Sequence, residues 1–533
     1  MKKGFLLFML CLLETVVPAQ ERIFVATDRP AYIAGDLVYC SLFCVDNEGR
    51  QSDFSAVAYL ELISTDGTAV EAKLGLFQGR GAGSFRIPAT TPTGNYRLMA
   101  YTARSQAAPE GARTLAVYNT SSTERVNGGV ALTPGFSPVL KPEAPAQGGL
   151  SLSVSGKGRE KTLLLGALDQ AADLSLSVYH DDALSSGDGV DLSAFLKGKP
   201  ALPGSRSGEY EGEVVLAAVE GLPAGADPVT AYLSTAGAPS NVYIGRSDEN
   251  GLVRFFTGNI YGQRELVCET DRSDTRLTLL SPFTHPGPGT LPVLQLGSAQ
   301  KDALTARRTS LQAHGGLSLD TLVRFLPRRQ DQLLSGQKVQ HYHLDDYTRF
   351  ASIQEVCVEI VHPLQFVRRD GEWKLRLITT DPTNSRRFVQ DNVLVMMDGV
   401  VLTNVGILNE FDALLLEDVD IYPQPVVMGT VPFNGVVNFV TKKNYVTALH
   451  FPENVRVVDF QGLAYPVAYP GQAPAGTDLR QLLYWHPALE TKAGTPERLR
   501  LTMPSYQGRF RVVAEGWKAD GTPVRAEYLF ETD

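Results

Sequence analysis

The sequence has 533 residues, of which 43% are apolar and 20% are charged, and its formal net charge is −9. These proportions are typical of a globular protein, and the length is enough for roughly three to five domains. The negative charge and the lack of basic runs argue against nucleic acid or an anionic membrane surface as the main ligand. The 49 glycines and 32 prolines favour an architecture of short strands and turns.

The start of the chain has the features of a secretory signal peptide over residues 1–19. Met1-Lys2-Lys3 is followed by an apolar run from Phe5 to Leu13, and Val17-Pro18-Ala19 ends in the small residue that a signal peptidase reads. The apolar run is too short to cross a bilayer, which takes about 20 residues. We therefore predict an exported chain whose mature form begins near Gln20.

Four cysteines remain after this segment, namely Cys40, Cys44, Cys268 and Cys357. Cys40 and Cys44 lie on the same face of a predicted strand, roughly 13 Å apart, which is beyond the reach of a disulfide. We expect the four cysteines to be small, buried apolar side chains. A disulfide between Cys268 and Cys357 stays open at this point.

Residues 20–118 are predicted to form a β-sandwich. Alternating runs such as Leu37 to Phe43, Ala56 to Leu62 and Tyr96 to Tyr101 are separated by Gly, Pro, Asn and Asp, which is the spacing of strands in such a fold. The segment from Thr27 to Asp36, with the strand after it, resembles the opening of a macroglobulin-2 (MG2) domain, and Gly94 to Leu98 resembles the turn into its late strand. The resemblance implies that this sandwich is an MG2 domain.

Four further segments follow. Residues 119–149 are rich in proline and glycine and are predicted to be a linker. Alternating runs then predict two β-sandwich units that resemble macroglobulin-like domains, one over 150–205 and one over 206–299. In the second of these, Asn250-Gly251 predicts a hairpin turn, because Asn-Gly readily adopts positive φ angles. Residues 300–340 are polar and permit a helix, and they are predicted to be a helical connector.

Residues 341–444 have the pattern of an α+β domain. The segment from Tyr347 to Val361 places apolar residues at spacings of three and four, which predicts an amphipathic helix. Three motifs follow in order: a strand that ends in Asp398-Gly399, then Val419-Asp420-Ile421, then Gly435 to Lys442. This order resembles the plug domain of TonB-dependent outer-membrane receptors, in which a strand ending in Asp-Gly, an Ile-x-Val strand and a Gly-Val-Ile-Asn-x-x-Thr-Lys strand follow one another.

The last segment, residues 445–533, contains alternating strands and is predicted to form a small C-terminal β-sandwich. It is too short for the barrel that follows a receptor plug, which needs roughly 22 strands. The whole order resembles large envelope proteins of Bacteroidetes-type bacteria that combine macroglobulin-like domains with a plug-like domain. The predicted fold class is therefore mainly β: tandem macroglobulin- or immunoglobulin-like β-sandwiches, one α+β plug-like domain and a C-terminal small β-sandwich.

We expect no catalytic, cofactor-binding or metal site. His341 and His343 share one face of a predicted strand and, with Asp345 and Asp346, could supply metal ligands, but a polar strand entering the α+β domain is the simpler interpretation. The sequence contains no HExxH, paired CxxC, nucleophile-elbow or phosphate-loop motif. It also lacks the Cys-Gly-Glu-Gln thioester of protease-trapping macroglobulins, so thioester-mediated capture of proteases is not expected.

These features predict a non-catalytic, exported envelope protein that binds or scaffolds other proteins at the outer membrane. The alternative is an accessory subunit of a TonB-dependent outer-membrane transporter, which supplies its plug-like domain to a separate barrel. In either case the expected partner is an outer-membrane or periplasmic protein, a β-barrel included, and neither a cofactor nor nucleic acid is involved. The mature chain is expected in the periplasm or in association with the outer membrane.

Overall fold

The structure is a computed structural model that describes residues 20–532 except 107–111, 186–191, 199–203, 205, 207, 236–239, 315–322, 325–333, 335, 370, 381–386, 444–448, 470, 472 and 475. The predicted signal peptide lies outside the described residues. No helix in this part of the chain is long and apolar enough to span a membrane. Strands far outnumber helices, which confirms the prediction of a mainly β chain.

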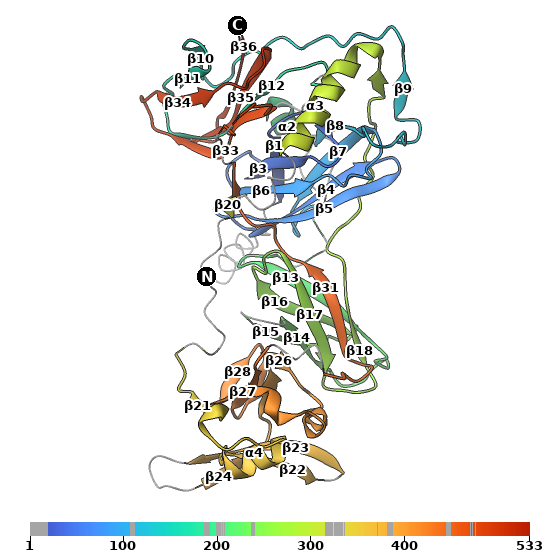
Figure 1. Cartoon of the computed structure of the whole chain (residues 1–533), viewed down its shortest axis with the longest axis vertical. Helices are drawn as coiled ribbons and strands as arrows, with labels where there is room; N and C mark the ends of the chain where they lie inside the picture. Colours follow the sequence, from blue (N-terminus) through green and yellow to red (C-terminus); the bar gives the residue numbers. More distant parts are fainter. Residues whose placement is uncertain are drawn as a thin grey trace, which may run out of the picture. The chain divides into compact units, whose positions relative to one another are not determined.

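The chain folds into two compact units, and each is assembled from separate stretches of sequence. Of the residues that the structure describes, those within 1–212, 283–326 and 463–533 form the first unit, and those within 213–282 and 327–462 form the second. Figure 1 is coloured along the sequence, and its red C-terminal strands lie beside cyan and blue strands of the first unit. Sequence order therefore does not give the order of the folded units.

The first unit begins with a β-sandwich, here called the N-terminal sandwich. Its two sheets have the strand orders β1-β3-β6 and β2-β8-β7-β4-β5. The strands are β1 (Glu21–Thr27), β2 (Ala31–Ile33), β3 (Leu37–Asp46), β4 (Val57–Ser64), β5 (Gly67–Gly75), β6 (Arg80–Arg86), β7 (Gly94–Tyr101) and β8 (Arg113–Tyr118). Alternate residues of each strand face the space between the sheets, so Cys40 and Leu42 of β3 share one core with Leu60 of β4 and Leu98 of β7.

A second sandwich of the first unit, the composite sandwich, combines distant parts of the sequence. Its sheets have the orders β10-β11-β34 and β33-β12-β35-β36. The strands are β10 (Leu152–Ser155), β11 (Glu160–Leu165), β12 (Ala172–His180), β33 (Leu482–Thr491), β34 (Glu497–Thr502), β35 (Arg509–Lys518) and β36 (Pro523–Glu531). The sequence predicted separate domains over 150–205 and 445–533, but the structure joins them, because β12 pairs with β33 on one side and with β35 on the other.

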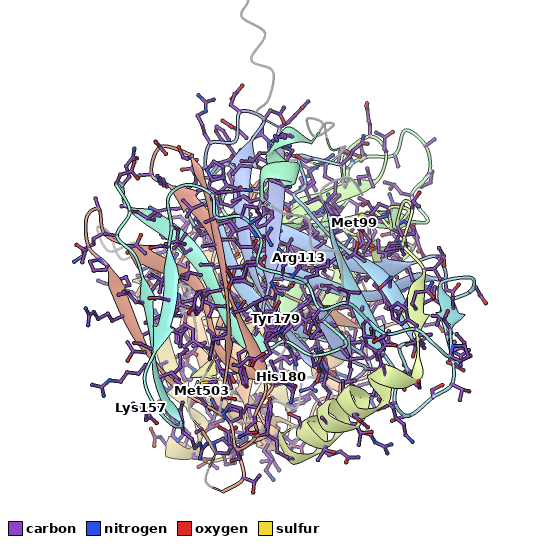
Figure 2. The ribbon with its side chains drawn as sticks, turned by 90° about the horizontal axis from the view of Figure 1, so that it is seen from above. Met99, Arg113, Lys157, Tyr179, His180 and Met503 are labelled. Carbon is purple, nitrogen blue, oxygen red and sulfur yellow. The ribbon has the colours of Figure 1, made fainter. Side chains whose placement is uncertain are left out.

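Burial gives the physical reason for this joining. Leu174, Leu176 and Val178 alternate along β12 and are fully buried, and the strands of residues 150–205 alone are too few to cover them. A charge pair ties the composite sandwich to the N-terminal sandwich, since Arg113 Nη2 of β8 lies 2.7 Å from Glu515 Oε1 of β35. Figure 2 shows Arg113 among the strands of the first unit.

The predicted linker and helical connector also take part in the first unit. Strand β9 (Val130–Leu132) of the linker pairs in parallel with β19 (Leu294–Leu296), and the backbone of Gln147 exchanges hydrogen bonds with Arg525 of β36. The connector supplies helix α3 (Lys301–His314) and β20 (Val323–Arg324), which pairs with β32 (Val467–Ala468), while most of its other residues lie outside the described ones. The linker is thus fastened along the edge of a sheet.

The second unit contains a third sandwich, the central sandwich, with sheets β16-β13-β18 and β15-β14-β17-β31. The strands are β13 (Glu213–Glu220), β14 (Thr230–Thr235), β15 (Val242–Arg246), β16 (Leu252–Gly258), β17 (Gln263–Thr270), β18 (Arg276–Leu279) and β31 (Arg456–Gln461). The predicted Asn250-Gly251 turn is present, and Gly251 has a φ of 74°. However, β15 and β16 belong to different sheets, because an Asn-Gly turn specifies the reversal of the chain and not the strand with which each arm pairs.

The second unit also contains an α+β lobe, in agreement with the α+β pattern of residues 341–444. Its sheets have the orders β21-β27-β30-β25-β26, β22-β23-β24 and β28-β29. The elements are β21 (Gln340–His343), α4 (Ile353–Glu359), β22 (Leu364–Arg369), β23 (Glu372–Thr380), β24 (Arg387–Gln390), β25 (Leu394–Met397), β26 (Val400–Val401), β27 (Leu416–Tyr422), β28 (Val426–Met428), β29 (Val431–Phe433) and β30 (Val436–Thr441).

Helix α4 is shorter than the predicted helix from Tyr347 to Val361. Ser352 is its N-cap, and the side chain of Ser352 accepts a hydrogen bond from the backbone N of Glu355 over 3.2 Å. Because a capping serine fixes the first turn, the helix begins at Ile353. The apolar face that the spacing predicted is nevertheless present, since Ile353, Val356 and Cys357 are buried in the core of the lobe.

The four described cysteines are free and buried, as predicted. Cys40 and Cys44 belong to the core of the N-terminal sandwich, Cys268 to that of the central sandwich and Cys357 to that of the α+β lobe. Cys268 and Cys357 therefore lie in different cores and form no disulfide. Desolvation raises the pKa of each of these two thiols to about 12, which keeps them protonated and unreactive.

Candidate functional site

The three motifs of the α+β lobe meet on one strand, β30. The strand that ends in Asp398-Gly399 is β25, and it pairs in parallel with β30. Strand β27 contains Val419-Asp420-Ile421 and pairs antiparallel with β30 on the other edge. Since β30 is itself the core of the third motif, the segments that the sequence singled out lie side by side in the structure.

Hydrogen bonds fasten the Asp398-Gly399 turn to β30. Both residues have positive φ angles, 48° and 78°, as a two-residue type I′ hairpin turn requires. The carboxylate of Asp398 accepts hydrogen bonds from the backbone N and from the hydroxyl of Thr441, each over 2.7 Å. Asn438 Oδ1 accepts a further hydrogen bond from Gly399 N over 3.0 Å. The polar residues of these motifs therefore hold the sheet together.

A cluster of two histidines and two aspartates lies on the exposed face of the pair β21–β27. The antiparallel register sets His341 opposite Asp420 and His343 opposite Asp418. All four side chains project to one side, because alternate residues of a strand share a face. Nδ1 of each histidine lies 2.7 Å from a carboxylate oxygen of the aspartate opposite, and His341 Nε2 lies 3.6 Å from Asp418 Oδ1.

The two aspartates of this cluster stabilise positive charge on the neighbouring histidines. The hydrogen bond that His341 donates to the Asp420 carboxylate raises the pKa of His341 above its ordinary value, and the hydrogen bond from His343 to the Asp418 carboxylate raises the pKa of His343. The side chains of His341 and His343 are 52% and 41% exposed. Ions in solution can therefore reach the imidazole nitrogens.

The sequence had placed a different pair of carboxylates, Asp345 and Asp346, beside the histidines. In the structure Asp345 is engaged elsewhere, with Lys442 at 3.3 Å and Arg349 at 3.4 Å. The carboxylates that join the histidines come from β27, far along the chain. One signal could have found them, because Asp418-Val419-Asp420 repeats the polar–apolar–polar spacing of His341-Tyr342-His343.

A cavity of about 140 Å³ in the first unit is lined by leucines and by arginines, tyrosines and other polar residues. Its arginines are Arg29, Arg86, Arg307 and Arg480. Three of them have acidic partners, in the pairs Arg29–Asp28 at 3.0 Å, Arg307–Asp182 at 2.7 Å and Arg480–Asp478 at 2.9 Å. Because these charges are matched inside the protein, the cavity is best described as an ion-paired junction between the N-terminal sandwich, α3 and the segment before β33.

The outward face of the sheet β16-β13-β18 carries apolar side chains. Register and alternation place Leu252 and Phe256 of β16, Leu216 and Ala218 of β13, and Leu280 after β18 on this face, together with the charged Arg254 of β16, which lies between Leu252 and Phe256 and opposite Leu216. Phe256 is 75% exposed and Leu280 is 39% exposed, and the other three apolar side chains are partly exposed. The opposite face of the same strands is buried in the core of the central sandwich. The sequence predicted these strands only as strands of a sandwich, and the apolar side chains on their outward face were not predicted.

Comparison with known proteins adds one family and several distant structures. The MG2 domain family matches residues 22–117, and no curated protein matches the chain. The native conformation of Escherichia coli alpha-2-macroglobulin is 9% identical with a TM-score of 0.25, over 97% of this chain and 40% of that one. The trypsin-activated E. coli protein is 9% identical with a TM-score of 0.25, over 96% of this chain and 41% of that one. Salmonella alpha-2-macroglobulin reacted with methylamine is 9% identical with a TM-score of 0.24, over 98% of this chain and 40% of that one.

The chain spans about two fifths of the length of these solved structures. The family match covers β1 to β8 almost completely, from Arg22 in β1 to Val117 in β8. It agrees with the resemblance that the Thr27 to Asp36 segment and the Gly94 turn implied. The N-terminal sandwich is therefore a macroglobulin-like MG2 domain.

Proposed function

We propose that this chain is an exported, non-catalytic envelope protein that binds another protein through the outward face of the central sandwich. The MG2 domain supports a protein-binding role, because its sandwich is a scaffold whose described residues supply no recognised catalytic motif. The signal-peptide pattern supports export. The partner is a protein of the outer membrane or the periplasm.

The observation that carries this proposal is the group of apolar side chains on the outward face of a sheet whose other face is buried in the core. A sheet at the surface of a sandwich normally has one buried and one polar face. Here Phe256 is 75% exposed near the end of β16, opposite the buried Val214, and the partly exposed Leu216, Ala218 and Leu252 lie on the same face beside Arg254. Apolar side chains gathered on an exposed face in this way mark a surface that another molecule covers, and an exposed aromatic ring among them is typical of an interface anchor.

Replacement of Phe256 tests the proposal. Phe256→Ser removes the anchor and leaves the core intact, so the matured protein should fold normally and lose its partner when it is isolated from detergent-solubilised envelopes. Phe77→Ser is the matched control, because Phe77 is 77% exposed but lies between β5 and β6 of the MG2 domain. Equal recovery of the same partner with both variants would contradict the proposed surface.

A second candidate function is supported by the α+β lobe. The three motifs that resemble a TonB-dependent receptor plug are joined on β30 by strand pairing and by the Asp398–Thr441 hydrogen bonds. On this second proposal the lobe is an accessory plug-like domain for a separate outer-membrane barrel. The two candidates differ in the contact surface: a plug-like role predicts that crosslinks to a barrel start from the lobe, and not from Phe256.

A further inference from the structure

We propose that His341, His343 and Asp418 form a Zn²⁺ site on the α+β lobe, and that Asp420 orients His341 for metal binding. The proposal is independent of the protein-binding function and replaces the sequence-based expectation of no metal site. The register of β21 and β27 brings the two histidines of His341-Tyr342-His343 and the two aspartates of Asp418-Val419-Asp420 onto one exposed face.

The distances suit a tetrahedral metal. Zinc ligands at about 2.1 Å from the ion lie about 3.4 Å from one another. His341 Nε2 is 3.6 Å from Asp418 Oδ1, and His343 Nδ1 is 2.7 Å from the same oxygen, so the two separations bracket this value. The three ligand atoms all lie within 4.8 Å of one another. Small rotations of partly exposed side chains bring them to a common centre.

Asp420 gives the cluster the orienting carboxylate that histidine ligands commonly have. His341 Nδ1 lies 2.7 Å from Asp420 Oδ1, and donation of the Nδ1 proton to this carboxylate leaves the Nε2 lone pair for a metal. The same contact directs Nε2 towards Asp418 Oδ1. The carboxylate of Asp420, the His341 ring and the Asp418 ligand therefore follow one another as in the carboxylate–histidine–zinc arrangement of known zinc sites.

The charges and the chemistry of the donors select the ion. Two neutral imidazoles and two carboxylates carry a charge of −2, which balances a divalent cation. Imidazole nitrogen together with carboxylate oxygen suits Zn²⁺, whereas Ca²⁺ and Mg²⁺ prefer oxygen ligands throughout. Nearby positive charge is already engaged, since Lys442 and Arg349 pair with Asp345. Three protein ligands leave a fourth position for water or for a donor from a partner.

Titration of the matured full-length protein with Zn²⁺ alone tests the site. Binding is measured by calorimetry in the His285→Ala background, which removes a second group of possible ligands formed by Glu61, Glu71 and His285. We expect one zinc ion per chain. His343→Ala should weaken binding by at least about tenfold, and Asp420→Asn by about 10- to 100-fold, because it replaces the carboxylate that orients His341 with a neutral amide.

The control variant is His362→Ala, which changes an exposed histidine of the same lobe whose Nδ1 lies 3.0 Å from the carbonyl oxygen of Val358. It should leave zinc affinity unchanged. Circular dichroism of each variant verifies that the lobe is folded, and Asp420→Asn keeps the size of the side chain if His343→Ala proves unstable. The proposal is overturned if the protein binds no zinc, or if His343→Ala and Asp420→Asn bind it as tightly as His362→Ala does.

Discussion

At the scale of residues, a buried arginine of the first unit is paired with an aspartate, whereas a buried glutamate of the second unit is held only by hydrogen bonds. Arg307 of α3 is 2% exposed and forms a bidentate pair with Asp182, both bonds being 2.7 Å long. Glu269 of β17 is 4% exposed, and its Oε1 accepts hydrogen bonds from the backbone N and the hydroxyl of Thr403. Its Oε2 has no hydrogen-bond partner among the described residues. The first arrangement matches a charge, and the second favours a neutral side chain.

Loss of the Arg307 charge should destabilise the first unit. Arg307→Ala leaves Asp182 buried without its partner, which costs on the order of 3 to 5 kcal/mol. The measurement is the free energy of unfolding of the first unit by urea. Arg308→Ala is the control, because Arg308 is the next residue of α3 and is exposed. Equal stability of the two variants would show that the Arg307–Asp182 pair does not hold the junction together.

Glu269 should make the second unit less stable as the pH rises. Desolvation raises the pKa of Glu269 from 4.5 to about 7, against the opposing hydrogen bonds from Thr403. The folded state therefore binds the proton more tightly than the unfolded state, so stability is lost between about pH 4.5 and pH 7, in total on the order of 3 kcal/mol. Glu269→Gln is neutral at every pH and should raise the Tm at pH 8 but not at pH 4.

A control on the same strand separates this effect from a general change in charge. Glu265 is exposed on β17, and Glu265→Gln should leave the difference between pH 4 and pH 8 as it is in the unchanged protein. If Glu269→Gln has the same Tm profile as Glu265→Gln, the buried carboxyl is not the source of the pH dependence.

At the scale of elements, the turn that leads into β30 depends on glycine. Gly435 has a φ of 144°, and a Cβ there would lie 2.5 Å from Leu377 Cδ2 and 3.0 Å from Tyr422 O. Gly435→Ala should therefore destabilise the second unit by at least about 1 kcal/mol in thermal unfolding. Gly371→Ala serves for comparison, because Gly371 also has a positive φ, 86°, but has open space around it. A larger loss for Gly371→Ala would contradict the close packing at Gly435.

The sequence predicted individual elements better than their partners. Alternation located β3, β4 and β7, and the motif at Asp398-Gly399 located a true turn, because both signals are local. Helix α4 was predicted too long, since apolar spacing continues through Phe350 while the cap at Ser352 fixes the start. The pairing of β12 with β33 and β35 could not be predicted, because alternating strands carry no mark of the strand beside them.

The candidate sites also divide into features that the local sequence predicts and features that depend on the pairing of strands. The sequence identified His341 and His343 as a pair on one face, but it could not place Asp418 and Asp420 opposite them, because the register of two strands 75 residues apart is a property of the folded sheet. The exposed face around Phe256 was missed for a related reason. Alternation in the sequence shows that a strand has two faces, but the packing of the other sheet of the sandwich determines which face is buried.

At the scale of the whole molecule, each unit is completed by chain that returns from elsewhere. Residues 463–533 return to the first unit and complete the composite sandwich, and β31 returns from the α+β lobe to pair with β17 of the central sandwich. The MG2 domain is continuous in sequence, which is why it could be identified from its residues alone.

If another protein covers the apolar face around Phe256, site-specific photocrosslinking at that position should detect the contact. A photoreactive phenylalanine analogue placed at position 256 in the living host should give one discrete adduct with an envelope protein, and Leu280→Lys on the same face should abolish it. The same analogue at position 77 should not give that adduct. A result in which position 256 forms no adduct, or in which the adduct survives Leu280→Lys and forms equally from position 77, would contradict the account.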